Sequence, residues 1–334
     1  MTGRRVAISV AVAAVLCVGS GLDAYLKLGA RSGNRVVSLR WSNQPIRYFI
    51  NSRSVTGVSA ADLQGAVERA FATWAGVPTA SLNIQFAGFT AAEPFVDDGV
   101  SVIGFRSRPD AERTLGAARH EVNEDNGVLV ASDIFFNSLF EWSVAPAGQA
   151  GRFDVESIAA HEIGHFLGLG HSLLGETSLR MGGGRSVLSK RAVMFPIAYS
   201  SGNVEDRTLE ADDVAGISDL YGTSSANRDL GAVSGRVTLN GRGIFGAHVE
   251  AFNPATGASV GGFSLSDSGE FVIGGLTPGM YVIRAEPLDD ADLDSFFNED
   301  AGVNTNFRVT YHPTLVAVPR GGSSGDIEIK VRAK

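Results

Sequence analysis

The chain of 334 residues contains a single cysteine, Cys17. One thiol cannot form an intramolecular disulfide, so a disulfide-rich scaffold is excluded, and so is a zinc site built from several cysteines. Charged residues make up only 19% and the formal net charge is −8, so no basic surplus favours nucleic acid as a partner. Hydrophobic residues, at 44%, are enough for packed cores and too many for a disordered chain. The length predicts about two domains.

A long apolar run is also missing. Arg4 and Arg5 precede a short apolar stretch, Val6 to Val18, which is followed by small residues. A membrane-spanning helix needs about 20 apolar residues, so this stretch is more typical of a secretory signal peptide than of an anchor or a buried helix. We predict a signal peptide over residues 1–24, no stable membrane insertion after its cleavage, and a secreted, extracellular or cell-surface protein.

The next part of the chain has the pattern of a mixed α/β domain. Apolar residues at helical spacing predict a helix over Asp62–Ala75, and similar arguments predict helices over Asp154–Gly168 and Leu209–Leu220. Between His171 and Met194 we expect a long surface loop, which includes Gly182–Gly184. Short apolar runs between turns predict six strands: Val36–Trp41, Ile46–Ile50, Leu82–Phe86, Val100–Phe105, Leu115–Val122 and Val128–Phe136.

The pattern changes after residue 222. Residues 223–230 are polar and are expected to form a linker. Residues 231–332 contain short strands between Gly, Asn or Pro turns and no helical pattern, which predicts a small all-β sandwich. The expected strands are Val233–Leu239, Ala247–Phe252, Ser259–Leu265, Glu270–Ile273 and Met280–Ala285.

One segment, His161–His171, carries three of the six histidines. His161 and His165 are four residues apart, so on a helix both imidazoles reach the same ion. His171 can supply a third zinc ligand if the chain turns back, and Gly168 allows such a turn because glycine adopts positive φ without steric cost. Glu162 would then lie beside a zinc-bound water as its general base. The alternative, that these are ordinary polar residues of a helix and its cap, is much less consistent with the full spacing.

The segment resembles the metzincin zinc signature HExxHxxGxxH, whose family members also have a methionine turn. Met194 matches that turn, and Pro196, two residues later, leaves no tyrosine at the position of the extra ligand found in other metzincins. With Ser172 after the third histidine, this is similar to the matrixins, the matrix-metalloproteinase-like family. Pro196-Ile-Ala-Tyr199 resembles the outer wall of the matrixin specificity pocket.

Residues 209–222 resemble the matrixin C-terminal helix, which implies that Asp212 and Asp213 brace the methionine turn and the mature N-terminus. The resemblance covers residues 36–222 and implies an α+β metzincin-type domain, a twisted mixed sheet with three helices. The family's latency cysteine and the histidines of its structural zinc site have no evident counterparts. We therefore expect one catalytic Zn²⁺. Ca²⁺ at Asp97-Asp98 or Glu124-Asp125 is an open alternative to plain solvation.

Residues 231–332 resemble carboxypeptidase-regulatory-like domains, which are prealbumin-type (Ig-like) sandwiches. Their histidines and carboxylates form no catalytic pattern, so we expect a spacer or a module that binds a protein or surface partner, and we expect cleavage to persist without it. The predicted function is a secreted zinc endopeptidase that cleaves extended peptide or protein substrates. The alternative is a catalytically silent binding or surface adhesion protein whose functional module is the sandwich.

Overall fold

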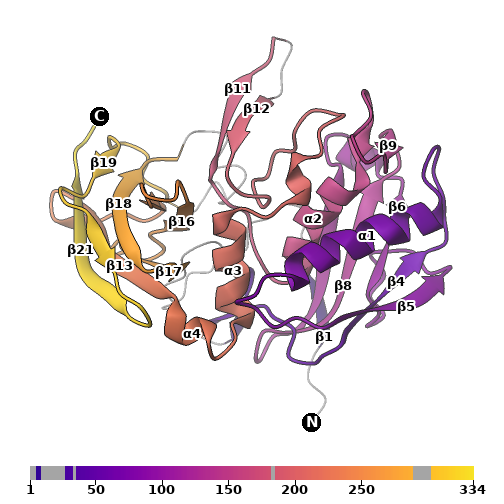
Figure 1. Ribbon diagram of the computed structural model, residues 1–334, viewed down its shortest axis with the longest axis horizontal. Coiled ribbons are helices and arrows are strands. Elements are labelled where there is room, and N and C mark those ends of the chain that lie inside the picture. The colour runs from indigo at the N-terminus through magenta and orange to yellow at the C-terminus, as the bar shows by residue number, and fades with distance from the viewer. Residues whose placement is uncertain (1–4, 9–26, 33–34, 182–184, 289–301) are drawn as a thin grey trace.

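A six-stranded mixed sheet is the framework of the first half of the chain. The computed structural model describes residues 5–8, 27–32, 35–181, 185–288 and 302–334 (Figure 1). In the sheet, β5, β4, β6 and β8 run parallel, while β7 is antiparallel to β8 and β1 is antiparallel to β7. The strands are β1 (Arg5–Ile8), β4 (Ile46–Asn51), β5 (Ile84–Thr90), β6 (Val102–Arg106), β7 (Gly116–Asn123) and β8 (Val128–Asn137).

Three helices accompany this sheet: α1 (Ala60–Ala75), α2 (Val155–Phe166) and α3 (Ala211–Tyr221). Helices α1 and α2 lie over one face of the sheet (Figure 1). Helix α1 begins at a capping box in which Ser59 and Asp62 satisfy each other's backbone N–H groups, and α2 begins at Asp154, whose carboxylate accepts from the Ser157 N–H. All three predicted helices are present, with ends that differ by one or two residues.

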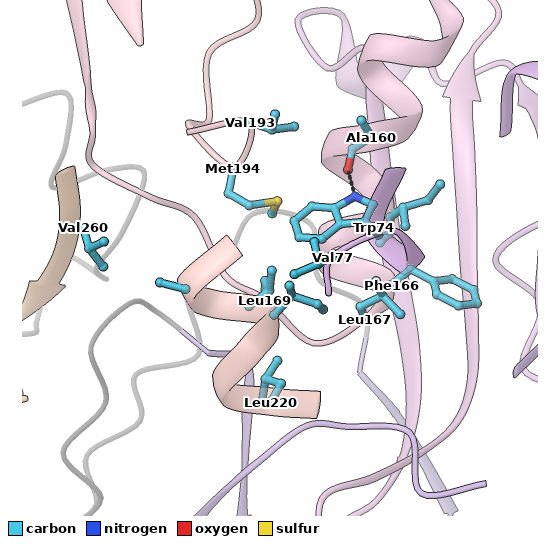
Figure 2. Packing of buried hydrophobic residues seen from close by; sticks show 14 of the residues in the cluster. Trp74, Val77, Ala160, Phe166, Leu167, Leu169, Val193, Met194, Leu220 and Val260 are labelled. Atoms are coloured by element: carbon cyan, nitrogen blue, oxygen red, sulfur yellow. Dashed lines mark hydrogen bonds between the residues drawn. The ribbon is translucent and has the colours of Figure 1, made fainter. Parts of the chain in front are cut away.

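Trp74 joins α1 to α2 in the centre of the core. Its indole Nε1 donates to the Ala160 carbonyl of α2 at 2.8 Å, and the ring is fully buried (Figure 2). The Met194 side chain lies beside the same indole. A Cβ added to Gly164 of α2 would stand 2.1 Å from the Met194 sulfur. At Gly164, helix α2 therefore leaves no room for a side chain between itself and the Met194 and Trp74 side chains.

The chain differs from the sequence prediction at Val36–Trp41. The strand there, β3 (Arg35–Ser38), ends earlier and pairs with β2 (Gly29–Ser32) instead of joining the main sheet. Trp41 instead forms hydrogen bonds near the end of α2. Its indole N–H donates to the Phe166 carbonyl at 2.8 Å, and its backbone N–H donates to the Tyr221 hydroxyl at 3.0 Å. Among the described residues of this stretch, Arg40 alone makes strand-type bonds to the main sheet, where its N–H donates to the Gly127 carbonyl and its carbonyl accepts from the Leu129 N–H.

The predicted loop after His171 contains a hairpin. Its strands, β11 (Gly175–Leu179) and β12 (Arg185–Lys190), pair antiparallel and project from the body at the top of Figure 1. Gly182–Gly184 lie outside the described residues. The remaining short elements of this half are β9 (Trp142–Ser143), β10 (Phe153–Asp154) and the 3₁₀ turns Pro109–Ala111 and Glu205–Arg207.

Of the predicted signal peptide, residues 1–24, only Arg5–Ile8 are described; the rest lies outside the described residues. Arg5–Ile8 form β1, which pairs with β7 from His120 to Asn123. Within the described part of the chain, no helix is both long and apolar enough to cross a membrane.

Two further sheets follow the one-turn helix α4 (Ala226–Asp229), which falls in the predicted linker. Residues from both sheets, such as Phe271 and Ile283, belong to one buried apolar cluster. The domain boundaries 36–222, 223–230 and 231–332, and the prealbumin type of the sandwich, stay predictions. One sheet contains β14 (Arg242–Gly243), β13 (Gly231–Leu239), β17 (Glu270–Leu276) and β21 (Ser323–Val331); the other contains β16 (Ser259–Phe263), β15 (His248–Phe252), β18 (Gly279–Glu286), β19 (Thr310–Tyr311) and β20 (Val316–Val318).

Candidate metal centre

The end of α2 and the turn that follows it bring three imidazoles together. His161 and His165 lie one helical turn apart on α2, and the helix ends at Phe166. Gly168 has φ +102°, which L side chains rarely adopt, and this residue turns the chain so that His171 faces the helix. One ligand atom from each histidine can be chosen so that all lie within 4.8 Å of one another, a group that could hold a metal ion.

Backbone carbonyls fix the protons of two of these imidazoles. His161 Nδ1 lies 2.7 Å from the Val193 carbonyl, and His165 Nδ1 lies 2.8 Å from the Leu169 carbonyl. A carbonyl oxygen can only accept, so each Nδ1 must carry the proton, and each Nε2 keeps its lone pair for a metal. Three neutral imidazoles with an open fourth position are a donor set that suits catalytic zinc.

Burial keeps the His161 and His165 imidazoles neutral. It lowers the pKa of His161 well below its ordinary value, with a further contribution from the neighbouring histidines, and lowers the pKa of His165 to about 4. Because a metal ligand must be unprotonated, both groups are in the binding form at neutral pH. The donors therefore fit the ion that the sequence predicts.

Glu162 lies beside the three imidazoles, and its carboxyl is buried. Its side chain is 5% exposed, and Oε2 is buried with no hydrogen-bond partner in the described part of the chain. Burial raises the pKa of the carboxyl to about 8. A Cβ added to Gly116, the first residue of β7, would stand 3.1 Å from Glu162 Oε1, so the carboxyl is pressed against the start of that strand. With this pKa the carboxyl holds its proton at neutral pH, and a cation bound by the neighbouring imidazoles would favour its ionised, proton-accepting form.

The methionine turn is tied to α3. The Val193 and Met194 N–H groups donate to the Asp213 carboxylate at 2.8 and 3.1 Å. Because the Val193 carbonyl also accepts from His161, Asp213 positions one ligand through a single intervening residue. Asp213 thus joins the N-terminal end of α3 to the methionine turn.

Asp212 has a different environment from the one expected. Its buried carboxylate accepts from the Gly261 N–H of β16 at 2.8 Å and bonds to the side chain of Ser172. Within the described residues, its partners are therefore the loop after His171 and the C-terminal domain, not an N-terminal ammonium group. Sequence periodicity carries no signal for such a contact, because it joins residues 49 positions apart.

Of the residues predicted to form a pocket wall, Tyr199 lies beside the hairpin. Pro196 and Tyr199 are half-buried, and the Tyr199 ring lies 5.0 Å from Lys190 Nζ at the end of β12. Lys190 also forms an ion pair with Asp206 at 2.5 Å. Sequence reasoning missed both residues, because a loop without periodicity gave no reason to place Lys190 near the site.

Of the two turns considered for calcium, Asp97-Asp98 has other contacts. Asp97 lies 4.0 Å from Arg119, and Asp98 Oδ1 accepts from the Val100 N–H at 2.9 Å. Nearby, Asp133 and Glu121 accept from backbone N–H groups of residues 95–102. Among the described residues, the cluster of three histidines is the one group found with the spacing of a metal site.

Comparison with known proteins decides the family. A family model described as matrixin matches residues 40–222, more than half of the chain. The chain belongs to the matrixin family. The predicted resemblance is thereby confirmed, together with the α+β metzincin-type fold of the first domain. The matrixins are a family of zinc metalloendopeptidases. Catalytic zinc belongs to that family, and its substrates are proteins or peptides.

The matched relatives have related catalytic domains within longer chains. The chain is 28% identical to the hatching enzyme of Paracentrotus lividus over 202 residues. This match covers 57% of this chain and 28% of that protein. The identity is 27% over 198 residues with metalloendoproteinase 1-MMP of Arabidopsis thaliana, 55% of this chain and 44% of that protein. For metalloendoproteinase 1 of Glycine max the identity is 30% over 175 residues, which cover 48% of this chain and 45% of that protein. The matches span less than half of each of these relatives.

Among solved structures, a chain from "The Bacillus anthracis TIE protein" aligns with a TM-score of 0.22 and 15% identity. The alignment covers 31% of this chain and 17% of that chain, and a score this low supports no structural argument.

Proposed function

We propose that this chain is a secreted zinc endopeptidase that hydrolyses peptide bonds of extended protein segments. The observation that carries the proposal is the group of three imidazoles, two of them with Nδ1 protons held by backbone carbonyls, beside the unsatisfied Oε2 of Glu162. His161, His165 and His171 would hold one Zn²⁺. The bound ion would supply a Lewis acid that polarises the scissile carbonyl, acidifies the attacking water and favours the ionised form of Glu162.

Glu162 carries the proton transfers in this mechanism. Its carboxylate accepts a proton from the attacking water and then delivers it to the nitrogen of the leaving amine. Helix α2 keeps this carboxyl at a fixed distance from His161 and His165. Asp213 holds the methionine turn at Met194 next to the site, and Gly168 allows the chain to turn toward His171.

The free edge of β7 is the proposed place for the substrate backbone. β1 pairs with β7 only from His120 to Asn123, so Gly116–Arg119 have no strand partner on that side among the described residues. Gly116 is also the residue next to Glu162. An extended peptide paired with Gly116–Arg119 would pass the catalytic carboxyl, as in β-augmentation, and Pro196 and Tyr199 would line the pocket for one of its side chains.

Export is a further part of the proposal. If residues 1–24 are removed as a signal peptide, β1 is removed with them and the whole outer edge of β7 becomes available. N-terminal sequencing of the exported chain checks this step. Retention of Arg5–Ile8 in the mature protein would contradict it.

The experiment that tests the activity compares the full chain with Glu162→Gln on an unstructured protein substrate. We expect Glu162→Gln to lower kcat/KM by about 10²–10⁴-fold, the usual contribution of a general base, while zinc content stays the same. Glu68→Gln, an exposed position on α1, is the matched control and should leave cleavage unchanged. Equal cleavage by wild type and Glu162→Gln would refute the proposed mechanism.

Metal analysis of the dialysed chain tests the stoichiometry. We expect one Zn²⁺ per chain. Bound calcium would point to Asp97-Asp98 or Glu124-Asp125, the turns that the sequence leaves as candidates. A binding or spacer role for residues 231–332, with a protein or surface partner, is proposed on the sequence resemblance alone.

A further inference from the structure

The segment directly after the third histidine lies against the C-terminal domain. Ser172, Leu173 and Leu174 are all buried, at 4%, 9% and 6% exposure. On one side, the Ser172 N–H donates to the Met194 carbonyl at 2.9 Å, which ties the segment to the methionine turn. Its other side contacts β16 and the loops around it.

Polar groups join the two domains at this segment. The buried Asp212 carboxylate bonds to both the Ser172 side chain and the Gly261 N–H of β16. A second connection runs through Arg191, whose N–H donates to the Leu174 carbonyl at 2.7 Å and whose guanidinium donates to Ser259 Oγ at 3.0 Å. Each connection has one end within three residues of His171 and the other end in β16.

Apolar packing covers the same segment. Leu173 belongs to a buried cluster whose other members all come from the C-terminal domain: Phe263 and Leu288, with Phe245, Leu265 and Val303 packed against them. Leu174 approaches Gly261 so closely that a Cβ there would stand 3.4 Å from Leu174 Cγ and 2.8 Å from His248 Nε2. Gly261 therefore lets β16 approach both side chains.

The three proposed ligands lie on different kinds of backbone structure. His161 and His165 are fixed by helix α2, whereas His171 lies on a loop between the Gly168 turn and the Ser172–Leu174 segment. A metal site binds and reacts well only if its ligands are held within about 0.5 Å of the working geometry. The position of His171 thus depends on what holds Ser172–Leu174 in place.

We propose that the C-terminal domain is a positioning element of the zinc site, acting on His171 through Ser172–Leu174, with Phe263 among its apolar contacts. The inference rests on the proposed zinc function. It replaces the expectation that cleavage persists without residues 231–332, and it makes Phe263 and Asp212 positioning residues, not catalytic ones.

The test uses the full chain with Phe263→Ala, and Ile329→Ala as the matched control. Both variants remove a large apolar side chain from the C-terminal domain, with 2% and 1% exposure, but Ile329 lies on β21 at the far side of that domain (Figure 1). Zinc affinity is measured by competition with a chromophoric chelator, and ligand geometry by the visible spectrum of the cobalt(II)-loaded chain. We expect Phe263→Ala to raise the zinc Kd by about 10–100-fold, as loss of a ligand's supporting contacts does, and to change the cobalt spectrum. Ile329→Ala should change neither.

A milder series keeps the test decisive if Phe263→Ala does not fold. Phe263→Leu retains most of the side chain and should give a smaller rise in Kd, while Leu173→Ala removes the contact from the other side and should give a similar rise to Phe263→Ala. A zinc Kd within threefold of wild type in folded Phe263→Leu and Leu173→Ala, or an equal rise in Ile329→Ala, would overturn the proposal. Failure of wild type itself to bind zinc would instead refute the proposed function.

Discussion

Gly168 turns the chain against the backbone of Leu39, so that a Cβ on Gly168 would stand 2.2 Å from the Leu39 carbonyl oxygen. This contact joins the end of α2 to the segment that follows the β2–β3 hairpin. The Leu28 N–H donates to the Gly168 carbonyl at 2.9 Å, which ties the turn to the chain on the other side of that hairpin as well. The turn that leads from His165 to His171 is therefore held in place by Leu28 and Leu39.

Gly168→Ala is expected to lower the free energy of unfolding by about 2–4 kcal/mol. The φ of +102° strains any L side chain, and the Leu39 carbonyl leaves no room for the added carbon. We also expect weaker zinc binding, because the turn sets the path to His171. Urea denaturation and zinc titration measure the two effects.

Gly65→Ala is the control for that variant. Gly65 lies inside α1, and a Cβ there would meet only the end of the Arg69 side chain at 3.5 Å. Alanine should stabilise this helix by about 0.5–1 kcal/mol. If both substitutions had the same effect on stability, the turn at Gly168 would not be strained in the way described.

The helices and the zinc ligands could be predicted because their signals are local. The apolar spacing of Leu63, Ala66, Val67 and Ala70 marks the buried face of α1, and the four-residue separation of His161 and His165 places both on one face of α2. Helix ends were less exact because capping allows shifts of a residue or two. The methionine turn came from resemblance and not from any local rule.

Other features could not be predicted because they depend on distant residues. Residues 39–41 form no strand because Leu39 packs on Gly168 and Trp41 bonds to Phe166 and Tyr221, up to 180 positions away. Asp212 was expected to brace the methionine turn and the mature N-terminus, yet its buried carboxylate accepts from the Gly261 N–H of the C-terminal domain. Such placements follow from how the two domains pack, for which the sequence has no periodic signal.

A second prediction concerns the buried ion pair at the base of the hairpin. Lys190 Nζ and Asp206 Oδ2 lie 2.5 Å apart with side-chain exposures of 5% and 10%. Lys190→Met should lower the free energy of unfolding by about 3–5 kcal/mol, because Asp206 is left as an uncompensated buried charge. Lys190→Met combined with Asp206→Leu should recover much of that loss. Urea denaturation of both variants checks this, and equal loss in the single and double variants would contradict it.

A third prediction is that Asp133 makes stability fall as pH rises. Burial raises the pKa of this carboxyl from 3.8 to about 7, even though it accepts from the Phe95 and Val102 N–H groups. Between about pH 4 and pH 7 the folded chain then binds more protons than the unfolded chain, so this group's contribution to stability decreases across that window. In Asp133→Asn, the plot of unfolding free energy against pH should be flatter there.

Asp110→Asn provides the comparison for the pH experiment. Asp110 is exposed, and its hydrogen bond to Arg108 lowers the pKa of its carboxyl to about 2. Its stabilising contribution is present above about pH 4 and is lost as pH falls toward 2, so this variant should leave the slope between pH 4 and 7 unchanged. A slope altered equally by both substitutions would assign the effect to net charge instead of to the burial of Asp133.

The final prediction is that removal of zinc destabilises the fold as well as stopping cleavage. Binding to the folded chain alone adds about 4 kcal/mol at a free zinc concentration 1,000 times the Kd, so a chelator should lower the thermal midpoint and zinc should restore it. His161→Ala should lose most of this response because it lacks one of three ligands. His312→Ala is the matched control: its imidazole bonds to the Thr314 carbonyl at 2.8 Å in the C-terminal domain, and it should respond as wild type does. If His161→Ala kept the full response to zinc, the ion would bind elsewhere, and the three imidazoles would not be the metal site.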